Sequence, residues 1–164
     1  MADDLHILIE ASIGLLGFSG ITLLLSGSPS EWPAAERARI TTMLIVTLIV
    51  LSGSLAWISI AKLANPNLAS QVVTWLLALS LGAFLVNAAI TLLPLFRSHD
   101  PTTHPGWAAM FMLPTMVLVV LMVSNQLVGF VEVFDLMYLA LVWSLIAAAL
   151  LFVRILLVRP GTGS

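Results

Sequence analysis

Five apolar stretches, each long enough to cross a lipid bilayer as a helix, make up most of this chain. They cover approximately residues 5–25, 40–61, 72–96, 107–130 and 136–158. A spanning helix needs about 20 apolar residues, and its backbone N–H and C=O groups must bond within the segment because the hydrocarbon core holds no water. The sequence therefore predicts an all-α fold, a polytopic bundle of five transmembrane helices. We expect one domain over residues 1–160 and a disordered tail over 161–164.

Composition argues against a soluble fold and against several classes of function. Charged residues are 9% of the chain and the mean hydropathy is +1.12, whereas about a quarter of the residues in a soluble domain are charged. The chain has no cysteine, which excludes disulfides, thiolate metal sites and cysteine nucleophiles. No basic cluster suggests nucleic-acid binding, and no catalytic motif of the common hydrolases, metalloproteases or nucleotide-binding enzymes occurs. We therefore expect no enzymatic activity, no cofactor and no nucleic-acid partner.

The distribution of positive charge predicts the orientation of the helices. If the N-terminus is outside, one basic residue, Lys62, lies outside and the other five lie in the cytoplasm: Arg37, Arg39, Arg97, Arg154 and Arg159. Basic residues are enriched on the cytoplasmic side of membrane proteins. The sequence thus predicts a multi-pass protein of the plasma (inner) membrane with its N-terminus outside and its C-terminus inside.

An imidazole and a carboxylate share one stripe of the first helix. His6, Glu10, Gly14 and Gly17 follow spacings of four, four and three, which place them on one face. A carboxylate inside a membrane is costly and usually faces protein or water, so we expect this stripe to turn inward. Glu10 then has two interpretations: a structural group that snorkels or bonds a neighbouring helix, or a carboxylate at the outer mouth of a cation or proton path.

Further acidic residues are expected on the same side of the membrane. Glu132 and Asp135 lie in the fourth polar break, and Asp3 and Asp4 lie at the N-terminus. In a symmetric oligomer each acid would repeat as a ring, and such rings select cations. The alternative is ordinary solvated loop charge.

Asn87 is the strongest polar residue within the third apolar stretch. With Ser80, Thr91 and Pro94 it forms a stripe that runs from mid-membrane toward the cytoplasm. A buried amide must be paired in hydrocarbon, so Asn87 either bonds another helix or lines a water path.

Small residues mark the helix faces that allow close packing. They recur as Gly14, Gly17 and Gly20, as Ser52, Gly53 and Ser54, and as Ala140, Ser144 and Ala148. Such faces serve packing within a chain, between copies or with another membrane protein. We expect a homo-oligomer, because a small bundle leaves several of these faces without an internal partner.

Two sets of residues suggest a metal only weakly. Met112 and Met116 flank Pro114 at a spacing that could hold Cu(I), but methionine is also a common apolar filler. The loop with His99, Asp100 and His104 offers three ligands for a divalent metal and no fourth, and we interpret it as a solvated loop. We therefore expect no metal site.

The leading hypothesis is a homo-oligomeric, cation-permeable channel or transport component with an acidic outer mouth. His6, Glu10, Glu132 and Asp135 would lie at the mouth and Asn87 deeper along the path. The alternative is a non-conducting accessory or scaffold subunit of a membrane protein complex, bound through its small-residue faces.

Overall fold

The computed structural model describes residues 2–25, 34–97 and 105–157, and these residues form five α-helices without a β-strand. The helices are α1 (Ala2–Leu25), α2 (Ala34–Leu63), α3 (Pro66–Arg97), α4 (Pro105–Val128) and α5 (Val133–Leu157). Each helix is long and apolar enough to cross a membrane. The structure thus confirms the prediction of an all-helical chain with five such helices. The tail over 161–164 lies outside the described residues.

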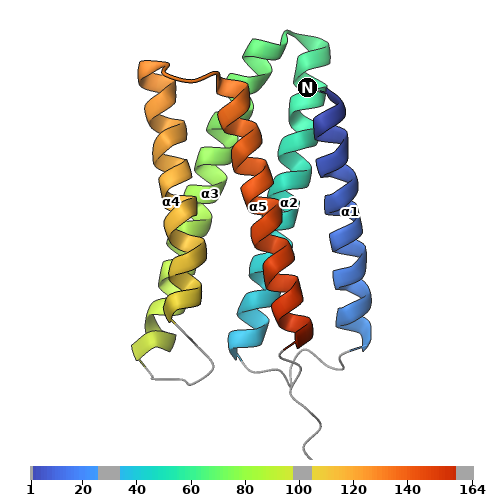
Figure 1. Ribbon diagram of the computed structural model, residues 1–164, viewed down its shortest axis with the longest axis vertical. Helices are drawn as coiled ribbons and strands as arrows, with labels where there is room; N and C mark the ends of the chain where they lie inside the picture. The colour runs from blue at the N-terminus through green and yellow to red at the C-terminus, as the bar shows by residue number, and fades with distance from the viewer. Residues whose placement is uncertain (1, 26–33, 98–104, 158–164) are drawn as a thin grey trace, which may run out of the picture.

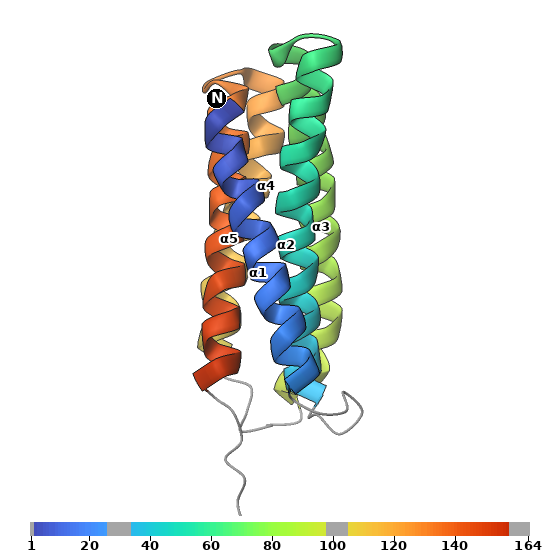
Figure 2. The same cartoon turned by 90° about the vertical axis from the view of Figure 1, so that its right-hand side faces the viewer.

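The helices run side by side along one axis, with α2 and α5 at the centre (Figure 1). The α3 and α4 helices pack on one side of this central pair, and α1 packs on the other. Figure 2 shows that α1 starts over α5 and crosses obliquely to α2. Because α1 touches neighbours along one side only, the rest of its surface faces away from the bundle.

The interior of the bundle is filled by apolar side chains from all five helices. Leu5, Val50, Val73, Met122 and Leu141, one from each helix, belong to one buried cluster. Several buried hydroxyls donate to the carbonyl four residues earlier in their own helix, at 2.7–2.8 Å: Ser12 to Leu8, Thr47 to Met43, and Ser144 to Ala140. Hydroxyls satisfied in this way need no water in the core.

The α3 helix begins six residues earlier than the sequence predicted, at Pro66 rather than Val72. Asn65 is the N-cap of this helix: its side-chain Oδ1 accepts a hydrogen bond from the N–H of Leu68 at 2.7 Å. Proline suits the first position of a helix because its missing N–H would have no partner there. The connection between α2 and α3 is therefore two residues long, because both helices extend beyond their apolar stretches.

The turn between α4 and α5 also differs in its boundaries. The α4 helix ends at Val128, and Gly129 then adopts a positive φ of 70°, which only glycine accepts without strain. Asn125 holds this turn closed. Its Oδ1 accepts from the N–H of Val131 at 2.9 Å, and its Nδ2 donates to the carbonyl of Val131 at 3.0 Å.

Candidate functional site

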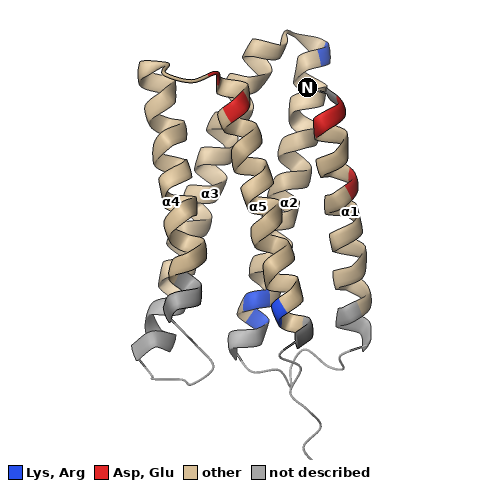
Figure 3. Ribbon diagram, viewed as in Figure 1, with Lys and Arg blue, Asp and Glu red and all other residues tan. Residues whose placement is uncertain are grey.

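Most of the charged side chains that the structure describes gather at the two ends of the bundle, acids at one end and arginines at the other (Figure 3). Asp3, Asp4, Lys62, Glu132 and Asp135 share one end, which we call the acidic end. The other end, the arginine end, carries the basic residues Arg37, Arg39 and Arg154. Glu10 is the acid that lies farthest from the ends among the described residues. The grouping of the acids expected from the spans is therefore present, with Lys62 among them.

The His6–Glu10 stripe of α1 faces away from the bundle. The buried face of α1 carries Leu5, Leu8 and Ser12, at spacings of three and four. Glu10 is two residues from both Leu8 and Ser12, and two residues turn a helix by about 200°. Glu10 and His6 are accordingly exposed in the single chain. The stripe does not turn inward as expected, because the contact face of α1 is the opposite one.

The depth of Glu10 makes this exposure costly in a membrane. At about 1.5 Å per residue, Glu10 lies about 12 Å along α1 from Ala2. Exposed apolar side chains, Ile7 and Ile13, lie on either side of it along the helix. A charged side chain facing lipid costs on the order of 3 kcal/mol at the bilayer centre and less toward the surface. A neighbouring protein surface or a water path next to α1 would remove this cost.

The small residues fall into two groups that differ in their surroundings. A Cβ added at Gly14, Gly17 or Gly20 would meet no atom within 4 Å, so the glycines of α1 face open space. Ala140, Ser144 and Ala148 of α5 are instead buried among the helices. In α2, a Cβ at Gly53 would lie 3.1 Å from Leu77 Cδ2 and 3.2 Å from Leu141 Cδ2. Close helix packing within the chain thus uses α2 and α5, and the glycines of α1 are left uncovered.

Glu132 and Asp135 are exposed where α5 begins. The carbonyl oxygen of Glu132 accepts from the N–H of Asp135 at 3.1 Å and from the N–H of Leu136 at 3.3 Å. Asp135 lies in the first turn of α5, where a negative charge interacts favourably with the helix dipole. Asp135 therefore has a local role at the start of α5, whereas Glu132 contributes its backbone carbonyl there, and both side chains add negative charge to the acidic end.

Asn87 lies far from Glu10. It is on the exposed side of α3, as is Ser80. Since α1 and α3 lie on opposite sides of α2, these residues do not line one path within a single chain (Figure 1). The side chains of Thr91 and Pro94, the other members of the expected stripe, are outside the described part of the chain.

No group of three potential metal ligands of the His, Cys, Asp or Glu type occurs among the described residues. The loop with His99, Asp100 and His104 lies outside those residues. Met112 is half-buried and Met116 is exposed on α4, which continues as a helix through Pro114. The carbonyl of Phe111 accepts a hydrogen bond from Thr115 Oγ1 next to this proline, at 2.7 Å.

Two tryptophans connect helices through hydrogen bonds that the sequence alone did not indicate. Trp57 Nε1 donates to Ser70 Oγ at 2.9 Å and joins α2 to α3. Trp143 Nε1 donates to Thr115 Oγ1 at 3.1 Å and joins α5 to α4. An indole N–H buried among apolar residues needs an acceptor. A tryptophan within one apolar stretch and a serine or threonine within another could therefore have indicated such a hydrogen bond.

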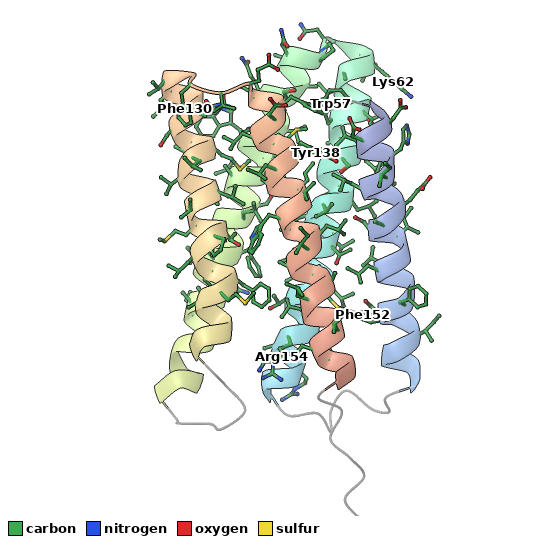
Figure 4. The ribbon with its side chains drawn as sticks, viewed as in Figure 1. Trp57, Lys62, Phe130, Tyr138, Phe152 and Arg154 are labelled. Atoms are coloured by element: carbon green, nitrogen blue, oxygen red, sulfur yellow. The ribbon has the colours of Figure 1, made fainter. Side chains whose placement is uncertain are left out.

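Aromatic rings gather around Trp57 at the acidic end. Its ring meets that of Phe134 edge-on at 5.3 Å, and Phe134 stacks on Tyr138 at 6.2 Å. Trp57 and Tyr138 lie on facing helices in Figure 4, with Phe152 and Arg154 at the opposite end. Trp57 belongs to the buried cluster of the bundle, and Phe134 and Tyr138 pack against that cluster.

Comparison with known proteins adds no assignment: no family model, curated protein or solved structure matches this chain.

Proposed function

We propose that the protein is a homo-oligomeric, cation-permeable component of the plasma (inner) membrane, with the outward face of α1 turned toward neighbouring copies. The observation that carries the proposal is the exposed pair His6 and Glu10, which no helix of the same chain covers. The uncovered Gly14 and Gly17 on the same face would allow the helices of neighbouring copies to approach closely.

The proposed path runs between copies and not through one chain. The interior of each chain is filled by leucine, valine and methionine side chains, and its hydroxyls mostly bond to their own helices. Copies arranged with α1 around a common axis would bring several Glu10 carboxylates together near the acidic end. A ring of carboxylates lowers the energy of a cation and raises that of an anion.

We also propose that the N-terminus lies outside. The arginines with described side chains at the end opposite the acidic end are Arg37, Arg39 and Arg154, and positive charge is enriched on the cytoplasmic side. A reporter fused after Ser164 should be active in the cytoplasm. Activity of that reporter on the outer side alone would reverse the orientation and place the acids in the cytoplasm.

Cysteine cross-linking tests whether α1 faces another copy. Because the sequence has no cysteine, any disulfide must form through the introduced residue. Ile13→Cys is on the outward face of α1 and should form disulfide-linked dimers in native membranes. Leu79→Cys, equally apolar and exposed on α3, is the matched control and should remain monomeric under the same oxidant. Equal cross-linking at both positions would mean random collision, and none at Ile13 would remove the proposed interface.

Ion flux tests the conduction itself. In liposomes the wild-type protein should pass cations, and Glu10→Gln should reduce this flux or change its cation preference while leaving the fold intact. Asp135→Asn, which removes a charge at the same end but on α5, is the control and should have the smaller effect.

A second function is favoured by the filled interior. A non-conducting accessory subunit would use the same α1 face to bind a different membrane protein. It predicts no flux from the wild type under voltage, pH or osmotic challenge, and no disulfide dimer from Ile13→Cys. That pair of results would replace the channel proposal by the accessory one.

A further inference from the structure

The central pair of helices, α2 and α5, packs in a constant antiparallel register. At the acidic end Trp57 meets Phe134. Lower down, Gly53 lies against Leu141, and near the arginine end Met43 and Val46 share a buried cluster with Ala148 and Leu151. Each step along α2 is therefore matched by an equal step in the opposite direction along α5.

This register places Arg39 and Arg154 opposite each other at the arginine end. Arg39 and Arg154 are both partly buried, at the same level of the facing helices. Figure 4 shows Arg154 at the lower end of α5, beside α2. Two positive charges held together by helix packing attract an anion more strongly than either charge alone.

The position of the pair along the membrane normal limits what that anion can be. Arg39 and Lys62 are separated by about 35 Å along α2 at about 1.5 Å per residue, slightly more than the thickness of a hydrocarbon core. Arg39 and Arg154 thus lie at the level of lipid headgroups. On α5, Leu150 and Val153 are exposed immediately beside Arg154 and offer an apolar surface for an acyl chain.

We propose that Arg39 and Arg154 together bind the phosphate of an anionic phospholipid in the leaflet at the arginine end. A guanidinium presents its N–H groups as a planar fork that fits phosphate oxygens, and such charge-assisted hydrogen bonds are among the strongest. This proposal concerns one lipid at one site, and it does not depend on the proposed cation path.

Thermal unfolding in nanodiscs tests the proposal. Wild-type protein should unfold at a temperature about 2–4 °C higher in phosphatidylglycerol than in phosphatidylcholine. Arg39→Gln and Arg154→Gln should each lose most of this difference, and the double variant should lose little more, because both residues hold the same phosphate. Arg37→Gln is the matched control: Arg37 is exposed on the same helix, and its variant should keep the difference.

The measurements in phosphatidylcholine separate lipid binding from a structural role. Any loss of stability that Arg39→Gln or Arg154→Gln shows there reports a contact of that arginine within the protein, and the proposal concerns the additional loss in phosphatidylglycerol. An equal loss of stability in both lipids, or an equal effect of Arg37→Gln, would overturn the proposal. Inorganic phosphate added to the phosphatidylcholine discs should not reproduce the gain; if it does, the site binds free anions and not a lipid.

Discussion

Replacing Asn125 by leucine should destabilise the protein through the turn between α4 and α5. The Asn125 side chain is 2% exposed and makes two hydrogen bonds, of 2.9 and 3.0 Å, with the backbone of Val131. Leucine has the same branching as asparagine but is larger, so the change removes both bonds, leaves no cavity and adds a packing cost. Each hydrogen bond contributes about 0.5–1.5 kcal/mol to the free energy of unfolding. Because Val131 is exposed, water at the membrane surface can bond to its backbone groups in the variant and reduce the loss. We expect the free energy of unfolding to fall by about 1–3 kcal/mol.

The assay is denaturant unfolding in mild detergent followed by tryptophan fluorescence. Asn125→Asp is an informative second variant, because it keeps the acceptor for the N–H of Val131 but places a carboxylate oxygen against the carbonyl of Val131. It should be at least as unstable as Asn125→Leu. Asn67→Leu, at an exposed position of α3, is the control and should change stability by less than about 0.5 kcal/mol. A similarly small change for Asn125→Leu would refute the reasoning.

Two further predictions concern contacts between helices. Gly53→Val should lower the free energy of unfolding by about 1–3 kcal/mol in the same assay, because its Cβ would lie within 3.2 Å of Leu77 and Leu141. Gly14→Val is the control and should leave the stability of the detergent-solubilised monomer within about 0.5 kcal/mol of the wild type. Equal losses would mean that α2 and α5 are not closely packed at Gly53. Trp57→Phe should lower the free energy of unfolding by about 1 kcal/mol, because Ser70 Oγ loses its donor while most of the aromatic packing remains. When Ser70 is already replaced by alanine, Trp57→Phe should cause no further loss.

The number and type of the helices could be predicted because the bilayer leaves a long apolar stretch little choice but a helix. The ends of the helices were harder to predict, since polar residues such as those around Asn65 were assigned to a loop. Asparagine followed by proline is in fact the start of α3, where the side chain of Asn65 caps the first turn. The asparagine–proline pair is present in the sequence, but the start of the helix was set by the first residue of the apolar stretch, which lies six residues later.

The face that each helix buries could not be predicted with the same security. In a soluble helix the apolar face is the buried one, but in a membrane both faces are apolar and the contrast is lost. The Leu5–Leu8–Ser12 face of α1 and the His6–Glu10 face show the same helical periodicity. Packing against α2 and α5 decides between them, and that choice depends on residues that are distant in the sequence.

The central position of α5 has a consequence for biosynthesis. Leu136, Met137 and Leu141 of this last helix complete a cluster whose other members include Leu5 of the first helix and Val50 of the second. At a synthesis rate of about 5–20 residues per second, α2 waits about 5–20 s for α5 to leave the ribosome. During that interval the surface around Gly53 and Ser54 meets lipid or the insertion machinery. The core is therefore completed late, and α2 must remain in the bilayer without its main partner until α5 arrives.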